Sequence, residues 1–156
     1  MSIRRGFAII AVLLIMAAAA CRYGYLIRGG VAAELESRAR ERAPSPFLFA
    51  DIASFPWDRV VFLGPYDNQV MADRALGFHW PDFRLFGLDS SDGFSLIIFA
   101  SAGHVVRAEK IGRCRPDFET ELIGTAVVRA NAKFAIVTKS DCPVLILASA
   151  LPAMAR

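Results

Sequence analysis

Three cysteines and two histidines are the side chains of this sequence best suited to do chemistry. Cys114 and Cys142 lie far apart in the chain, and two such thiols can form a disulfide in an oxidising compartment. Two other outcomes stay open, namely free buried thiols and a zinc site shared with His79 and His104. Structural zinc sites usually bring paired ligands at C-x2-4-C or H-x3-5-H spacing, and these four residues stand singly. We therefore expect a Cys114–Cys142 disulfide and no metal site.

A catalytic acid–base centre in this chain would have to be built on a histidine. His79 precedes Asp82, whose carboxylate could hold the imidazole in one tautomer, whereas His104 follows a short glycine-containing turn. The sequence has none of the motifs of zinc proteases, thiol oxidoreductases, serine hydrolases or phosphate-binding loops. We therefore expect no catalytic residues and no cofactor. A small hydrolase-like enzyme centred on His79 and Asp82 is the alternative.

Aromatic and polar residues in the middle of the chain are candidates for lining a ligand groove, because small-molecule sites combine aromatic walls with a few polar groups. The candidates are Trp57, Asp58, Tyr66, His79, Trp80 and Arg113. In the structural alternative, which the residue types favour, Trp57 and Tyr66 pack around a buried strand and Asp58 pairs with Arg59 or binds backbone N–H groups.

The first 21 residues have the pattern of an export signal. Arg4 and Arg5 precede an uncharged apolar run over residues 7–20, which ends in small alanines before Cys21. Such an ending resembles a bacterial lipoprotein signal, in which the cysteine is lipidated, although Ala18 stands where leucine is usual. An uncleaved signal anchor and a cleaved secreted form are the alternatives. All three place residues from about 31 onward outside the cytoplasm, and we expect them at the periplasmic face of a bacterial membrane.

Composition and charge limit the partners of the exported part. The chain is 55% apolar and 21% charged, which excludes a disordered or collagen-like protein. The formal net charge of +3 includes Arg4 and Arg5, so the part without the signal is almost neutral. A neutral domain is not attracted to phosphate backbones, and we expect no nucleic-acid partner. Arg38, Arg40 and Arg42 could contact anionic lipid, but the pattern favours a solvated helix face.

Periodicity and breaker residues predict an α+β fold. Residues 31–43 form a helix that ends before Pro44, and residues 68–76 form a second helix between a cap at Asp67 and a stop at Gly77. In the second helix Val70, Met71, Ala75 and Leu76 are expected to face inward. The predicted strands are residues 60–63, 83–88, 94–100, 104–111, 134–139 and 144–148, while residues 118–129 fit either strand or helix.

These elements predict a mainly antiparallel sheet of about five strands with one or two packed helices, following an N-terminal signal or anchor helix. The expected organisation has three parts: residues 1–21 as lipoprotein-like signal or membrane anchor, 22–53 as helical tether and connector, and 54–156 as the globular domain.

Residues 57–66 read Trp-Asp-Arg-Val, an apolar strand, and then Gly-Pro-Tyr. This segment resembles one found in small bacterial lipoproteins and secreted proteins of unknown function. Residues 96–106 resemble the strand, turn and strand of those proteins, and residues 113–118 resemble the loop that follows, so the resemblance covers roughly residues 54–138. It implies a shared fold unit and carries no activity.

The sequence therefore predicts a non-enzymatic, membrane-tethered module outside the cytoplasm that binds an unidentified ligand or an envelope protein. The first alternative is the hydrolase-like enzyme at His79 and Asp82. The second is an inhibitor or folding partner of another envelope protein.

Overall fold

The computed structural model describes residues 30–41 and 45–151, so Cys21 and the whole predicted signal lie outside the described residues. The helices are α2 (Gly30–Arg38), α3 (Phe49–Ile52) and α4 (Gln69–Leu76). The strands are β1 (Phe47–Leu48), β2 (Arg59–Leu63), β3 (Phe94–Ser101), β4 (His104–Gly112), β5 (Asp117–Phe118), β6 (Ala126–Val128), β7 (Lys133–Lys139) and β8 (Cys142–Leu147).

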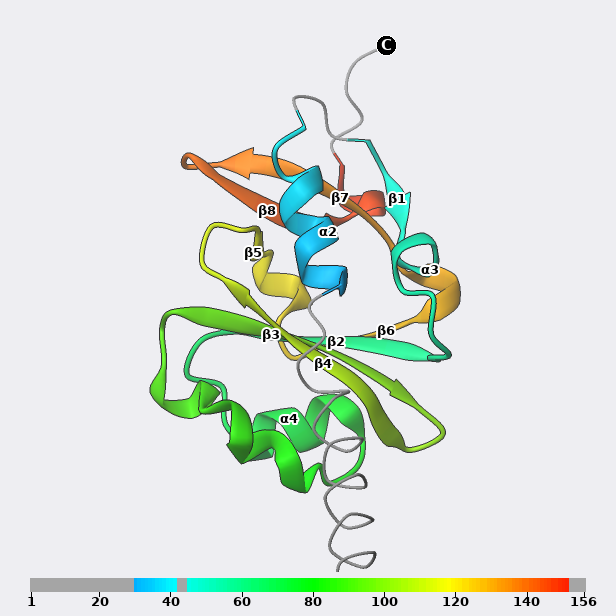
Figure 1. The fold of residues 1–156 in the computed structure, drawn as a ribbon, viewed down its shortest axis with the longest axis vertical. Coiled ribbons are helices and arrows are strands. Elements are labelled where there is room, and N and C mark those ends of the chain that lie inside the picture. Colours follow the sequence, from blue (N-terminus) through cyan, green and yellow to red (C-terminus); the bar gives the residue numbers. More distant parts are fainter. Residues whose placement is uncertain (1–29, 42–44, 152–156) are drawn as a thin grey trace, which may run out of the picture.

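The strands form two four-stranded sheets, stacked one over the other in Figure 1. One sheet, called here the β7–β8 sheet, has the order β1-β7-β8-β5, and the other, the β2–β3 sheet, has the order β4-β3-β2-β6. Every pairing is antiparallel except that of β5 with β8. The predicted α+β class is confirmed, with the strands divided over two sheets where one was expected.

The space between the two sheets holds an aromatic core. Phe49 from α3 and Phe134 from β7 have ring centroids 4.3 Å apart, and Phe62 from β2 lies 5.4 Å from Phe134. All three side chains are fully buried. Edge-to-face and tilted ring pairs of this kind add to the free energy gained by burying the rings. This core therefore joins the β7–β8 sheet to the β2–β3 sheet.

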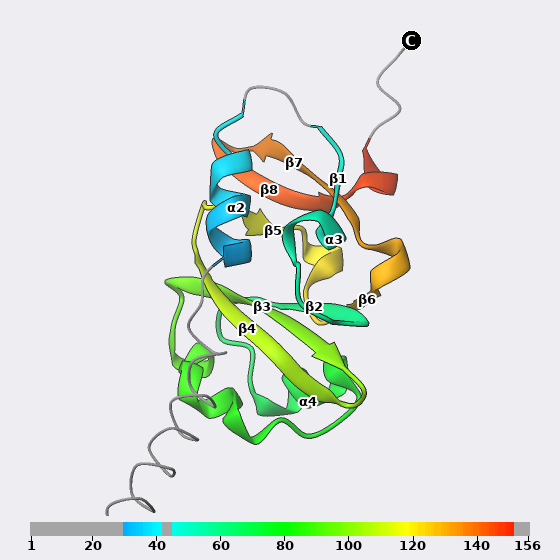
Figure 2. The ribbon, with the colours of Figure 1, turned by 45° about the vertical axis from the view of Figure 1, so that its right-hand side comes forward.

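A second core covers the opposite face of the β2–β3 sheet. Because side chains alternate along a strand, Val60 and Phe62 of β2 face the aromatic core, whereas Val61 and Leu63 face α4. Helix α4 and the 3₁₀ helix η1 (Pro81–Phe86) form the outer layer on this side, at the lower end of the molecule in Figure 2. The contiguous apolar run in β2 thus reflects a strand buried on both faces.

Two sequence predictions for this outer layer are wrong. Residues 83–88, expected as a strand, lie in η1 and in the 3₁₀ helix η2 (Leu88–Ser90). Phe83 and Phe86 are three residues apart, so the 3₁₀ period places both on the buried side. In α4, Leu76 is buried as expected, but Val70 and Met71 are 65% and 39% exposed.

Helix α4 begins one residue later than predicted. Asn68 is the N-cap, and its Oδ1 accepts hydrogen bonds from Val70 N and Met71 N. Asp67, the expected cap, is buried and accepts a 2.8 Å hydrogen bond from Gly64 N. Gly77 ends the helix in the left-handed conformation, with φ 80°, as the sequence predicts.

Helix α2 belongs to the domain itself, beside the β2–β3 sheet. Its Val31, Ala32 and Leu35 are part of the aromatic core. Buried Glu109 of β4 accepts a 2.8 Å hydrogen bond from Ala32 N, and its other oxygen lies 2.6 Å from Arg107 Nε. Residues 31–35 and 47–53 therefore contribute buried side chains to the same core as the β2–β3 sheet.

Candidate functional site

The two tryptophans of the predicted ligand groove lie in different cores. Trp57 is 4% exposed, packs edge-on against Phe99 in the aromatic core, and donates from Nε1 to Ala53 O. Trp80 is 3% exposed and packs against Phe83 and Phe86 in the second core. The β2–β3 sheet stands between these clusters, so the two rings cannot line one groove.

The polar members of the predicted groove have local structural contacts. Asp58 accepts hydrogen bonds from Ala102 N at 2.9 Å and from Arg59 Nε at 3.0 Å. These bonds, the one from Ala102 most of all, hold the pKa of the Asp58 carboxyl below its ordinary value. Asp58 thereby fixes the turn between β3 and β4.

Tyr66 and Arg113 lie apart from this turn. Tyr66 is 61% exposed ahead of α4, and Arg113 donates from Nε to Asp117 Oδ1 at 3.0 Å. The structure therefore does not bring the six predicted residues together into one ligand site.

His79 contacts Asp73, and not Asp82 as the hydrolase alternative proposes. Its Nδ1 lies 2.7 Å from Asp73 Oδ2, while Asp73 Oδ1 accepts hydrogen bonds from Trp80 N and Gln69 Nε2. Burial acts to raise the pKa of Asp73, but these hydrogen bonds outweigh it and lower that pKa. The Asp73 carboxylate thus ties the 77–80 loop to α4, and the His79 side chain is 68% exposed.

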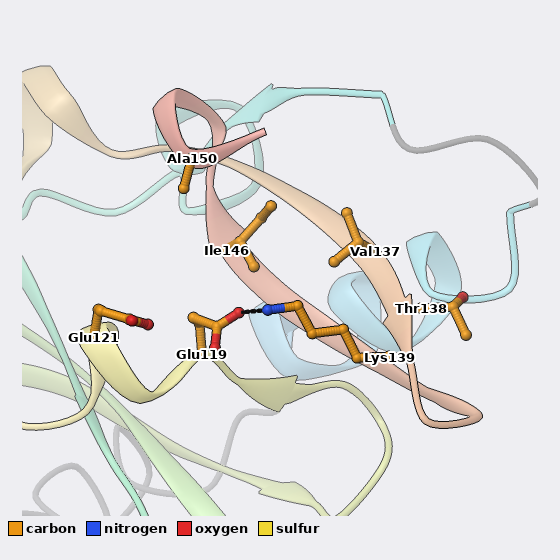
Figure 3. A pocket seen from close by; sticks show the side chains of 7 residues that line it. All are labelled: Glu119, Glu121, Val137, Thr138, Lys139, Ile146 and Ala150. Atoms are coloured by element: carbon orange, nitrogen blue, oxygen red, sulfur yellow. Dashed lines mark hydrogen bonds and ion pairs between the residues drawn. The ribbon is translucent and has the colours of Figure 1, made fainter. Parts of the chain in front are cut away.

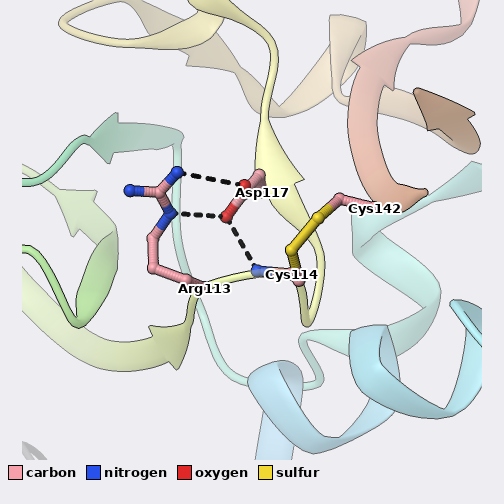
Figure 4. The surroundings of a disulfide bond; sticks show 4 residues. All are labelled: Arg113, Cys114, Asp117 and Cys142. Carbon is pink, nitrogen blue, oxygen red and sulfur yellow. Dashed lines mark hydrogen bonds and ion pairs between the residues drawn. A yellow bond between two sulfur atoms is a disulfide. The ribbon is translucent and has the colours of Figure 1, made fainter. Parts of the chain in front are cut away.

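Cys114 and Cys142 form the predicted disulfide, shown in Figure 4. Asp117 supports the bridge by accepting hydrogen bonds from Cys114 N at 2.9 Å and from Arg113 Nε. Cys114, Asp117 and Cys142 have their ligand atoms within 4.8 Å of one another, and neither His79 nor His104 joins them. Because the two sulfurs are bonded to each other, the zinc alternative built on both cysteines and both histidines is wrong.

A groove of about 390 Å³ lies on the face of the β7–β8 sheet that points away from the aromatic core (Figure 3). We call it the outer groove. Its lining residues are Glu119, Glu121, Val137, Thr138, Lys139, Ile146 and Ala150. Ala135 and Val144 are buried on the same face and pack with Ile146, Val137 and Leu151. One wall comes from the segment after β5, and the floor comes from the β7–β8 hairpin.

The rim of the outer groove is charged. Lys139 and Glu119 form an ion pair across the end of the hairpin, with side chains that are 54% and 25% exposed. The hydrogen bond from Lys139 holds the pKa of Glu119 below its ordinary value. Glu121 adds a second carboxylate to the lining, in which Lys139 is the only basic residue. The lining therefore carries one uncompensated negative charge.

Sequence reasoning missed the outer groove, although one signal for it was present. Residues 134–137 and 144–147 are apolar without alternation, which in paired strands means that both faces of the hairpin carry apolar side chains. The aromatic core covers one face, and the other forms the floor of the groove. The acidic wall could not be foreseen, because it lies within residues 118–129, whose conformation the sequence left open.

Comparison of the chain with protein-family models, with curated proteins and with solved structures found no match. The resemblance of residues 57–66 to small lipoproteins and secreted proteins stays a prediction.

Proposed function

We propose that this protein is a non-enzymatic binding module outside the cytoplasm, tethered at the periplasmic face of a bacterial membrane, with the outer groove as its binding face. The Cys114–Cys142 disulfide is the observation that carries the proposal. Such bridges persist in oxidising compartments, which fits an extracytoplasmic location. This one links the loop before β5 to the first residue of β8, and those two segments lead directly into the wall and the floor of the groove.

The tether in this proposal is the N-terminal segment. No helix within the described residues is long and apolar enough to cross a membrane. The proposed attachment therefore rests on residues 1–21, through a lipid on Cys21 or through the apolar run as an anchor. Even fully extended, the chain between Cys21 and Gly30 spans at most roughly 30 Å. A tether of that length would keep the domain close to the membrane surface.

Binding explains the placement of the reactive side chains better than catalysis does. His79, the residue on which the hydrolase alternative depends, pairs with Asp73 on the exposed surface of the α4 layer and is not part of the outer groove. Inside the groove, Lys139 and Glu119 pair with each other over an apolar floor. An apolar surface with a few polar groups at its rim is the usual composition of a recognition site.

The proposal can be tested by crosslinking in living cells. A photoreactive amino acid is placed at Ala150, which is exposed and lines the outer groove, and as a control at Val70, which is exposed on α4. We expect a discrete crosslinked product from Ala150 that Val70 does not give, and we expect Val137→Asp to abolish it by placing a charge on the groove floor. The same products from both positions, or none from Ala150, would contradict the proposal.

A further inference from the structure

We propose that the layer formed by α4 and η1 rests on the membrane surface, with its exposed apolar side chains among the lipid headgroups and the upper acyl chains. We call this surface the α4 face; its apolar members are Tyr66, Val70, Met71 and Leu85. The inference rests on the proposed function, from which it takes the tether. It gives the domain an orientation in which the outer groove, on the other sheet, points away from the membrane.

The α4 face gathers the most exposed apolar side chains of the described part of the chain. Val70, Tyr66 and Leu85 are 65%, 61% and 58% exposed. On α4, Val70 lies on the side opposite Ala72, which packs against the β2–β3 sheet, so Val70 points away from that sheet. Single exposed apolar side chains are normal, but several on one layer mark a surface that makes contacts.

Hydrogen bonds hold the α4 face together as one surface. Gln69 Nε2 donates to Trp80 O at 2.8 Å, which joins α4 to the start of η1, and Tyr66 N donates to Leu88 O at 3.1 Å, which joins the segment ahead of α4 to η2. Tyr66 has a φ of 64°, a left-handed conformation that favours glycine. Neither backbone conformation nor burial calls for an aromatic ring there, whereas a contact outside the domain does.

The chain enters the domain on the side of the α4 face. Helix α2 begins at Gly30 beside β4 and runs toward the β7–β8 sheet, where the Arg38 guanidinium lies 4.6 Å from the ring centroid of Phe47 (Figure 2). Gly30 therefore lies at the level of the β2–β3 sheet, whose other face is covered by α4. Because the stretch from Cys21 to Gly30 spans at most roughly 30 Å, a membrane that holds residues 1–21 lies nearer to the α4 face than to the outer groove.

The charge of this layer selects the kind of lipid. Residues 64–93 contain five aspartates and two arginines, with no lysine or glutamate. A net negative surface is not attracted to anionic lipid, so the contact has to come from burial of apolar area. Tyrosine is favoured at the membrane–water interface, and Arg74 and Arg84 can extend their charged ends to lipid phosphates. The partner is therefore a zwitterionic lipid surface.

The test measures how close each end of the domain lies to a bilayer. The full chain is purified from membranes into nanodiscs of phosphatidylcholine, of which a fraction carries a nitroxide quencher just below the headgroup. A fluorescent amino acid is placed at Arg84, which is exposed on η1, or at Ala150, which is exposed at the outer groove. We expect strong quenching at Arg84 and little at Ala150.

Variants then test the apolar contact, with the label at Arg84. Leu85→Asp should shift the equilibrium at least about threefold toward the undocked domain, and Val70→Asp combined with Leu85→Asp should remove most of the quenching. Leu48→Asp is the matched control, because Leu48 is exposed on β1 of the other sheet, and it should leave the quenching unchanged. Replacing a third of the lipid with phosphatidylglycerol should not increase the quenching.

The results distinguish failure of this inference from failure of the tether. Equal quenching at Arg84 and Ala150, or no effect of Leu85→Asp, would overturn the membrane contact and leave the tether in place. A rise in quenching with phosphatidylglycerol would overturn the apolar basis of the contact. Unquenched Arg84, together with crosslinks between two copies through Val70, would assign the α4 face to a second copy and overturn the inference. A chain that does not insert into the nanodiscs would overturn both the tether and the inference.

Discussion

A buried carboxylate, Glu109, adds to the apolar packing that attaches α2 to the β2–β3 sheet, and its removal should be costly. Glu109 is 2% exposed, and it both caps the amino end of α2 through Ala32 N and faces the Arg107 guanidinium. In Glu109→Ala, the Ala32 N–H loses its acceptor, and the Arg107 guanidinium loses the carboxylate that lies 2.6 Å from its Nε. Arg107 keeps 19% exposure and its contact over the Phe55 ring, so it is not wholly dehydrated.

Breaking a buried ion pair usually costs 3–5 kcal/mol, and the partial exposure of Arg107 places this one near the lower end, at about 3 kcal/mol. Urea unfolding followed by the fluorescence of buried Trp57 and Trp80 measures the loss, with an expected fall in the midpoint of about 1.5 M.

Two control variants make this reasoning refutable. Arg107→Met with Glu109→Leu removes both charges and should recover more than half of the loss, because an apolar pair needs no counterion. Glu34→Ala, at the partly exposed Glu34–Arg38 pair of the same helix, should cost less than about 0.5 kcal/mol. The reasoning fails if Glu109→Ala costs as little as Glu34→Ala, or if the double variant is less stable than Glu109→Ala.

Three further predictions concern other parts of the fold. Cys142→Ser opens the loop closed by a bridge between residues 28 apart in sequence, and should lower the free energy of unfolding by about 3.5 kcal/mol in urea titrations; insensitivity to reductant would contradict this. Asn68→Ala should cost about 1 kcal/mol by thermal unfolding, whereas Asn68→Ser should retain most of that stability. The ionised Asp73 carboxylate stabilises the fold fully above its ordinary pKa of 3.8, and this stabilisation is lost as the pH falls through its lowered folded-state pKa. In this pH range the free energy of unfolding should therefore fall less steeply with pH for Asp73→Asn than for the unchanged protein. Equal slopes for the two proteins would refute the role of Asp73.

Local patterns were sufficient to predict the hairpins. The apolar runs at residues 94–100 and 104–111 are separated by a short glycine-containing turn, and β3 and β4 pair there as expected. The strands at residues 134–139 and 144–148 also pair, and their turn ends at Cys142 of the predicted disulfide. Each hairpin could be predicted because its two apolar runs and its turn are neighbours in the sequence. The disulfide could be predicted because Cys114 and Cys142 are the two cysteines outside the predicted signal.

Features that depend on tertiary contacts were not predictable in the same way. Which face of α4 is buried depends on the position of the β2–β3 sheet, and Ala72 packs against it where Val70 and Met71 were expected. The six residues of the predicted ligand groove were grouped by chemical type, whereas the sheet separates Trp57 from Trp80. The outer groove needs the register of β7 against β8 and the position of the segment after β5, and neither is encoded in a local motif.

The most direct test of a disulfide-linked, membrane-tethered module is the intact mass of the native protein from each cell fraction, with thiol alkylation before and after reduction. We predict membrane-bound protein that begins at an acylated Cys21 and gains two alkyl groups, on Cys114 and Cys142, only after reduction. Full-length protein in which Cys21 alone reacts before reduction would replace the lipid with an uncleaved anchor. Protein in the soluble cytoplasmic fraction, with Cys114 and Cys142 reactive before reduction, would contradict the account.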